Sequence, residues 1–185
     1  ENDALTAITG QINAYSPDTL FRDNGSDPDH LGTPEAMIIS FGGGSIVGGT
    51  DATDYTAGNT TAVGSFAGGS LTVNADGSFS VNDPTMTGDF TFLYRLDNTV
   101  GTSDATVTIT INEAPQAQND GYTFLYTVEQ TVDSANGLFA DNGFGADYLG
   151  YPSATLISFG GGELGGTVDD QVAGSTVGLA GGSLT

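Results

Sequence analysis

A long internal repeat is the feature that most constrains the fold of this chain. The segment LFRDNGSDPDHLGTPEAMIISFGGG at residues 20–44 returns as LFADNGFGADYLGYPSATLISFGGG at residues 138–162, 118 positions later. The segment AGGSLT at residues 67–72 returns at residues 180–185, and the dipeptide Asn2-Asp3 returns as Asn119-Asp120. A period of about 115 residues is much longer than that of solenoid repeats and matches one β-sandwich domain.

The triple glycine inside the repeat, ISFGGG, has two interpretations. A glycine-rich loop can wrap a phosphate, or it can form one corner of a repeated structural unit. The following residues GGGSIVGGT contain no Gly-Lys-Ser/Thr ending and no lysine, and no helix-forming segment follows them. The pattern therefore favours a corner of the repeat.

Alternation of apolar and polar residues predicts β-strands along the chain, and no window shows a helical period. A hairpin turn is predicted at Asn74-Ala75-Asp76-Gly77, since an Asp-Gly step suits a turn with positive φ. We expect an all-β fold of two-sheet sandwich domains. The side chains predicted to face the core are Leu71, Val73, Phe79, Val81, Phe90, Phe92, Tyr94, Leu96, Ala105, Val107, Ile109, Ile111, Tyr122, Phe124, Tyr126 and Val128, with Ile39 and Phe41 as the inward pair of their strand.

The segment NEAPQAQND separates two domains, because Pro115 interrupts a strand and its polar neighbours suit a connector. We expect one domain at residues 1–116 and a partial second copy at residues 117–185. The second copy lacks counterparts of residues 73–117, which include the strongest predicted strands. Either the chain is part of a longer array, or a neighbouring molecule donates the strands and builds a fibre by strand complementation.

The charge of the chain excludes some partners. The formal net charge is −21, and Arg22 and Arg95 are its basic residues apart from His30. This field repels nucleic acids and anionic membranes and attracts divalent cations. The chain has no cysteine, which excludes disulfides and thiolate metal sites, and no apolar run long enough for membrane insertion.

Several motifs together resemble a known family. Each copy has the order ND, GLFADNG or its counterpart, and ISFGGG; the first copy continues with GGSLTVNADGSFSV and GDFTFLYRLDNTVGTSDATVTITIN. This resembles the bacterial Ig-like, cadherin-like tandem repeats of large surface proteins and adhesins. The resemblance implies a rod of Ig-like sandwich domains, located outside the cell or on its surface, in contact with neighbouring repeats and often stiffened by calcium (Ca2+).

The loop DNGSDPD is one candidate calcium site. Calcium prefers six to eight oxygen ligands. Pro28 replaces the glycine that an EF-hand loop requires, and Asp and Asn are also common turn residues, so a turn without metal is the alternative. The candidate ligands are Asp23, Asn24, Asp27 and Asp29 in the first copy and Asp141, Asn142 and Asp147 in the second.

The domain junction is the second candidate, because cadherin-like repeats place acidic residues around their connectors. Glu113, Asn119 and Asp120 lie there, and we expect Asp97 and Asp104, which flank the loop between the last two strands, to face it. The chain has no DxNDN connector of the kind found in cadherins, so eukaryotic-type coordination is not expected.

We expect no enzymatic activity. The single histidine, His30, is replaced by Tyr148 in the second copy, and neither a G-x-S-x-G nor an H-E-x-x-H motif occurs. A structural and adhesive extracellular module is the first hypothesis. The alternative is a carbohydrate-binding sandwich that binds surface glycans, with Tyr148 and Tyr151 as its best surface aromatics.

Overall fold

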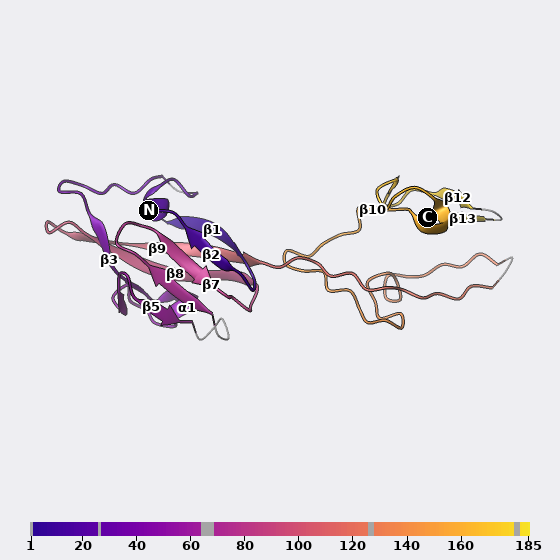
Figure 1. The fold of residues 1–185 in the computed structure, drawn as a ribbon, viewed down its shortest axis with the longest axis horizontal. Helices are drawn as coiled ribbons and strands as arrows, with labels where there is room; N and C mark the ends of the chain where they lie inside the picture. The colour runs from indigo at the N-terminus through magenta and orange to yellow at the C-terminus, as the bar shows by residue number, and fades with distance from the viewer. Residues whose placement is uncertain (1, 26, 64–68, 126–127, 180–181) are drawn as a thin grey trace. The chain divides into compact units, whose positions relative to one another are not determined.

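The computed structural model describes residues 2–25, 27–63, 69–125, 128–179 and 182–185, and these residues form an all-β protein with almost no helix (Figure 1). The elements in chain order are β1 (Asp3–Ile8), β2 (Ile12–Tyr15), η1 (Thr19–Phe21), β3 (Met37–Gly42), α1 (Gly44–Val47), β4 (Tyr55–Thr56), β5 (Thr60–Ala62), β6 (Ser70–Val73), β7 (Phe79–Asn82), β8 (Gly88–Asp97), β9 (Thr102–Asn112), β10 (Ser158–Phe159), η3 (Gly162–Leu164), β11 (Gln171–Val172), β12 (Val177–Leu179) and β13 (Gly182–Leu184).

The chain divides into two compact units. Unit 1 contains Glu1–Ala114 together with Gly150–Pro152, and unit 2 contains Pro115–Leu149 together with Ser153–Thr185. The main division falls beside Pro115, inside the segment that the sequence identifies as a connector.

The larger sheet of unit 1 has the strand order β1-β9-β8-β3-β4. Its centre is the antiparallel β8–β9 hairpin, which runs in register from Gly88↔Ile111 to Asp97↔Thr102. Strand β1 lies parallel to β9, from Asp3↔Val107 to Ile8↔Asn112. The first and last strands of the unit are therefore neighbours, although about a hundred residues separate them in sequence.

The second sheet of unit 1 has the order β2-β7-β6-β5 and shares one core with the first. The predicted hairpin is confirmed: β6 pairs with β7, and the Gly77 amide donates to the Asn74 carbonyl at 3.2 Å. Phe79 of β7 contacts Phe92 of β8 across the two sheets, with ring centroids 5.9 Å apart. The predicted inward residues of these strands are buried, namely Leu71, Val73, Phe79, Val81, Phe90, Phe92, Tyr94, Leu96, Ala105, Val107, Ile109 and Ile111.

Strand β3 departs from simple alternation. Phe41 is buried as predicted, but Ile38 rather than Ile39 is its inward partner, and Ile39 is 38% exposed. The cause is an irregularity between Ile38 and Ser40 in the pairing with β8, which shifts the register by one residue. A bulge reverses the face on which the preceding side chains lie, and period-two alternation does not reveal it.

The triple glycine forms a tight corner that leads from β3 into α1, a helix of 4 residues where the sequence predicted none. Gly44 has φ +67°, and a Cβ there would lie 2.2 Å from the Thr91 carbonyl oxygen of β8. Ser45 and Thr91 hold the corner by two reciprocal bonds, from the Ser45 amide to Thr91 Oγ1 at 3.1 Å and from the Thr91 amide to Ser45 Oγ at 2.8 Å. The corner needs glycine because backbone packs against backbone.

The described residues of unit 2 contain two short antiparallel strand pairs, β10–β11 and β12–β13. They repeat the β3–β4 and β5–β6 pairs of unit 1 at corresponding residues: Ser158↔Val172 corresponds to Ser40↔Thr56, and Val177↔Leu184 to Thr61↔Leu71. The strand predicted around Tyr122 and Phe124 is absent from residues 121–125 and 128, and Tyr126 lies outside the described residues. Its counterpart in unit 1 is β1, whose partner is β9.

The corner yields a test of the fold. Gly44→Ala should lower the free energy of unfolding of unit 1 by at least about 3 kcal/mol, because it combines positive-φ strain with a backbone clash. Gly48→Ala is the matched control: its φ is +80°, but nothing lies within 4 Å of the added Cβ. The control should cost about 1–2 kcal/mol. Equal losses in urea unfolding would contradict the close approach to Thr91.

Candidate functional site

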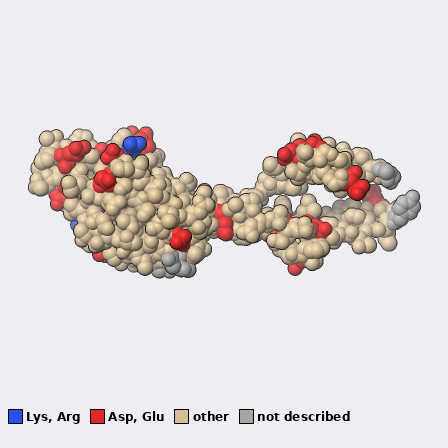
Figure 2. All heavy atoms as spheres, viewed as in Figure 1, with Lys and Arg blue, Asp and Glu red and all other residues tan. Residues whose placement is uncertain are grey.

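The surface of the protein is acidic without one dominant cluster. Figure 2 shows Asp and Glu side chains at several separate places on the visible face, with little basic surface between them. Within the described ranges, no group of three or more His, Cys, Asp or Glu side chains is placed to hold a metal ion.

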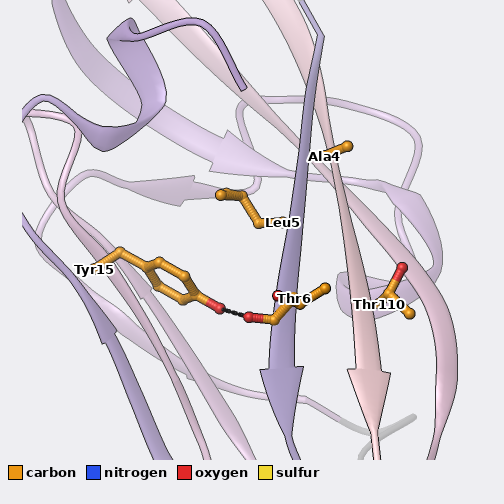
Figure 3. Close-up of a pocket in the computed structure, with 5 residues that line it drawn as sticks. All are labelled: Ala4, Leu5, Thr6, Tyr15 and Thr110. Atoms are coloured by element: carbon orange, nitrogen blue, oxygen red, sulfur yellow. Dashed lines mark hydrogen bonds between the residues drawn. The ribbon is translucent and has the colours of Figure 1, made fainter. Parts of the chain in front are cut away.

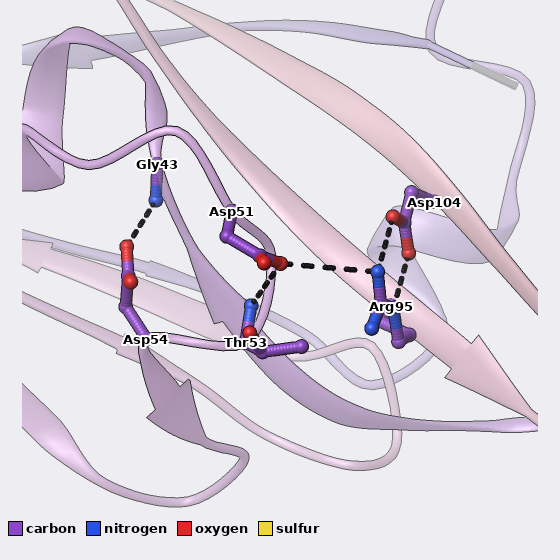
Figure 4. A network of polar contacts seen from close by, with 6 residues as sticks. All are labelled: Gly43, Asp51, Thr53, Asp54, Arg95 and Asp104. Atoms are coloured by element: carbon purple, nitrogen blue, oxygen red, sulfur yellow. Dashed lines mark hydrogen bonds and ion pairs between the residues drawn. The ribbon is translucent and has the colours of Figure 1, made fainter.

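Backbone amides of the glycine corner and of the loop that follows it bind aspartate side chains of the same loop. The Gly43 amide donates to Asp54 Oδ2 at 2.9 Å, and the Thr53 amide donates to Asp51 Oδ1 at 3.1 Å (Figure 4). A carboxylate therefore occupies the position at the Gly43 amide where a phosphate-binding loop would receive its anion. This arrangement agrees with the structural role that the sequence favours for the triple glycine.

Asp104 and Asp97 have partners at the turn end of the β8–β9 hairpin. Arg95 binds Asp104 through two bonds, Nε to Oδ1 at 2.6 Å and Nη2 to Oδ2 at 2.7 Å, and lies 3.8 Å from Asp51 (Figure 4). The bond from Arg95 lowers the pKa of Asp104. Asp97 Oδ1 accepts from the Thr99 amide at 2.7 Å.

These two acids do not meet the connector acids within unit 1. Asp104 precedes Asn112 by eight residues along β9, which corresponds to about 26 Å of strand, and Glu113 follows Asn112. A calcium ion binds its ligands at about 2.3–2.6 Å, so one ion cannot join the two ends of this strand. Within unit 1, the structure therefore separates Asp97 and Asp104 from Glu113, which the sequence groups with them.

The buried polar centre of unit 1 lies elsewhere, around Asp3 and Tyr94. Asp3 is only 5% exposed. The Tyr94 hydroxyl lies 2.5 Å from Asp29 Oδ2, 3.3 Å from Asp3 Oδ2 and 3.2 Å from the Leu20 carbonyl oxygen. One hydroxyl proton thus faces three acceptors, two of them carboxylates.

Asn24 connects this centre to the backbone of the loop. Its Nδ2 donates to Asp3 Oδ1 at 3.1 Å and to the Thr19 carbonyl. Its own carbonyl oxygen accepts from the Ala4 amide at 2.8 Å. The DNG loop is therefore attached to the start of β1 through one asparagine, which explains why that residue type suits the position.

The same contact is present in unit 2. Asn142 Nδ2 donates to Asp120 Oδ1 at 2.9 Å and to the Gly137 carbonyl at 2.8 Å, as Asn24 does to Asp3 and Thr19. Its Nδ2 also donates to the Tyr122 hydroxyl at 2.7 Å. The repeat thus copies an interaction as well as a sequence.

The other loop acids stabilise turns. Asp23 Oδ1 accepts from the Gly25 amide at 3.2 Å. Asp141 Oδ1 accepts from the Gly143 and Gly145 amides, each at 3.0 Å, and these bonds lower the pKa of Asp141. Asp147 Oδ1 accepts from the Gln118 amide at 2.6 Å, whereas Asp27 and Asn119 are exposed.

The Asp3 centre fits calcium in the kind of its donors but not in their number. Asp3, Asp29 and the Leu20 carbonyl supply oxygens, whereas calcium takes six to eight. Asn24 presents its Nδ2 rather than its side-chain oxygen to Asp3. The contacts describe a hydrogen-bonded centre that would need further oxygen ligands to hold an ion.

Burial raises the pKa of Asp3 to about 6; the Asn24 bond lowers it, and the nearby Asp29 charge raises it. Burial, followed by the bond to Asp29, also raises the pKa of Tyr94, which keeps the hydroxyl protonated. Asp3 therefore changes its charge between neutral and mildly acidic pH.

Two open surface hollows lie on the described part of unit 1. One is lined by Ala4, Leu5, Thr6, Tyr15 and Thr110, and the Tyr15 hydroxyl donates to the Thr6 carbonyl (Figure 3). Another lies beside His30, which is exposed. Among the described residues, no helix is both long and apolar enough to cross a bilayer.

The two loop tyrosines pair with the connector through their backbone. Within unit 1, Tyr151 exchanges backbone hydrogen bonds with Glu113, both at 3.0 Å. Within unit 2, Tyr148 does the same with Gln116, at 2.7 and 3.0 Å. These residues help to position the connector segment, a role that their sequence alone did not suggest.

Comparisons with protein-family models, curated proteins and solved structures found no match to this chain.

The Asp3 centre predicts an unusual pH dependence. The folded-state pKa of about 6 exceeds the ordinary value of 3.8, so folded unit 1 binds the Asp3 proton more tightly than the unfolded chain does. Stability should therefore rise as the pH falls through 6 and level off near 4, by up to about 3 kcal/mol. Asp104 and Asp76, whose pKa values are lowered, reduce stability only at still lower pH.

Urea unfolding at several pH values between 7.5 and 4.5 measures this effect. Asp3→Asn should remove the rise, whereas Asp27→Asn, which neutralises an exposed carboxylate in the same loop, should retain it. A wild-type stability that is flat or falls between pH 7 and 5 would show that Asp3 is not the titrating group.

Proposed function

We propose that this chain is a structural and adhesive module of a large extracellular bacterial protein, a stalk or fibre built from tandem Ig-like, cadherin-like β-sandwich domains. The observation that carries the proposal is the parallel pairing of the terminal strands β1 and β9 in unit 1. The family resemblance of the repeat supports the extracellular location and the contact with neighbouring repeats.

Parallel terminal strands suit a domain that transmits force. The chain enters beside Val107, at Asp3, and leaves at Asn112, about 17 Å further along the same direction of the sheet. Tension between these points slides β1 along β9, so the bonds of the whole ladder are loaded together. An antiparallel pair with adjacent ends would open one bond after another.

The repetition of details supports a role as building material. Unit 2 repeats the pairing registers of β3–β4 and β5–β6 and the Asp–Asn contact of unit 1. By contrast, His30 changes to Tyr148 between the copies, and Asp27 changes to Gly145. We therefore assign no catalytic role to these loops and propose a non-enzymatic function.

Single-molecule pulling tests the proposal. The chain has no cysteine, so attachment points can be introduced freely. Force applied between the N-terminus and Ala114→Cys should unfold unit 1 at a clearly higher force than between Ile8→Cys and Ala114→Cys. In the second geometry Ile8 and Asn112 are direct neighbours, and the strands peel apart. Equal forces in the two geometries would contradict a force-transmitting role.

Calcium is the second part of the proposal. We place it at the Asp3 and Asp29 carboxylates and, in unit 2, at Asp120 and Asp147, with water completing the oxygen ligands. A bound divalent ion would relieve the repulsion between Asp3 and Asp29. Millimolar calcium, the affinity range of extracellular modules, should therefore raise the melting temperature of the full chain.

The matched variants are Asp29→Asn, which should lose the gain in melting temperature from unit 1, and Asp51→Asn, an exposed control that should retain it. An equal response to magnesium and calcium would indicate general charge screening. No response to either ion would leave the centre held by the Tyr94 and Asn24 hydrogen bonds alone. Glycan binding to the same chain would instead favour a carbohydrate-binding module.

A further inference from the structure

Unit 2 exposes apolar side chains whose counterparts form the core of unit 1. The repeat aligns the two units residue by residue, so each exposed side chain can be compared with its buried equivalent. Leu20, Ile38, Val63 and Leu71 are 1%, 1%, 1% and 0% exposed, whereas Leu138, Leu156, Leu179 and Leu184 are 46%, 45%, 43% and 43% exposed. We call these four leucines the open apolar face of unit 2, because they occupy the positions that line the core of unit 1.

Unit 1 shows what covers this face. Strands β7, β8 and β9 supply Phe79, Phe92, Tyr94 and Val107 to the shared core, each 0–2% exposed. Among the described residues of unit 2, no strand corresponds to any of these three. The corresponding cover would be an antiparallel β8–β9-type hairpin in one sheet and a β7-type strand in the other, each alternating apolar and polar side chains.

The pairing pattern of unit 2 points to the same missing segment. The pairs that persist, β10–β11 and β12–β13, are those whose partners both lie within unit 2. The counterparts of β1 and β2 are not strands in unit 2, and in unit 1 their partners are β9 and β7. The two segments that are not strands in unit 2 are thus the counterparts of strands that pair with the β7–β9 segment in unit 1.

A polar contact adds specificity to this face. In unit 1 the Tyr94 hydroxyl of β8 reaches Asp29, Asp3 and the Leu20 carbonyl. In unit 2 the corresponding Asp120 is already held by Asn142, at 2.9 Å. One acceptor of the tyrosine site, the Asp120 carboxylate, is thus held by an asparagine in unit 2 as Asp3 is held by Asn24 in unit 1.

We propose that the open apolar face of unit 2 binds a β7–β9-type polypeptide segment with a tyrosine at the position of Tyr94. This segment is a second one, distinct from the strands β7 to β9 that complete unit 1. Binding orders residues 120–125 into a strand, because a β9-type partner then offers its backbone bonds. The segment of unit 1 is not the occupant, since Phe92, Tyr94, Val107 and Ile109 are each 0% exposed in their own core. Exchange between two copies would have to empty that core.

The experiment uses the full 185-residue chain and a polypeptide with the sequence of residues 73–117. Hydrogen exchange is followed at residues 120–125. The added segment should slow exchange there roughly 100-fold and form a one-to-one complex in sedimentation. A chain extended covalently by the same segment should show the protection without any added peptide, which covers the case in which the free segment aggregates.

Two adjacent residues provide matched variants. Leu156 corresponds to the buried Ile38, and Ile157 corresponds to Ile39, which remains 38% exposed in unit 1. Leu156→Asp should abolish the protection, and Ile157→Asp should leave it intact, although both side chains are exposed in unit 2. Tyr94→Phe in the added segment alone should weaken binding roughly tenfold through loss of the bond to a carboxylate.

Three results would overturn the proposal. The first is unchanged exchange at residues 120–125 with the peptide and with the covalent extension. The second is dimerisation of the unextended chain with protected residues 120–125, which would make a second copy the occupant. The third is an equal effect of Leu156→Asp and Ile157→Asp, which would mean that the contact is not the face that unit 1 buries.

Discussion

The pairing of β8 with β9 is the interaction on which the rest of unit 1 depends. β9 provides the edge to which β1 binds in parallel, and β8 provides the edge to which β3 binds. Their inward side chains fill the space between the two sheets, and the Tyr94 hydroxyl reaches the buried Asp3. Unit 2 contains matching sequence for several other strands, yet without such a hairpin in its described residues its apolar side chains remain exposed.

Local sequence patterns predicted those parts of the fold that depend on local geometry. Alternation identified the buried faces of β6 to β9, and an Asp-Gly step identified the turn between β6 and β7, because both follow from the period of a strand and from glycine conformations. The bulge in β3 was missed because one irregular residue leaves no mark in the alternation. The parallel pairing of β1 with β9 was also missed, since it joins residues more than a hundred positions apart.

The acidic candidates show the same difference between local and non-local information. Counting acids along the DNG loop named Asn24 and Asp29 but grouped them with Asp23, which stabilises a turn. The acid that lies beside Asn24 and Asp29 in the structure is Asp3 of β1. Asp3 was not among the predicted ligands, although Asp120, its counterpart in the second copy, was. The alignment of Asn2-Asp3 with Asn119-Asp120 held the signal that could have found it. Tyr94 gave no such signal, because its alternation marks it only as a core residue.

The most direct test of this account compares the two copies of one strand in the unmodified chain. Amide hydrogen exchange should be slow across β1, Asp3–Ile8, where the backbone pairs with β9, and close to unprotected at the corresponding residues 120–125 of unit 2. Equal protection of the two segments in a monomeric chain would contradict the claim that the β8–β9 hairpin is what orders each unit.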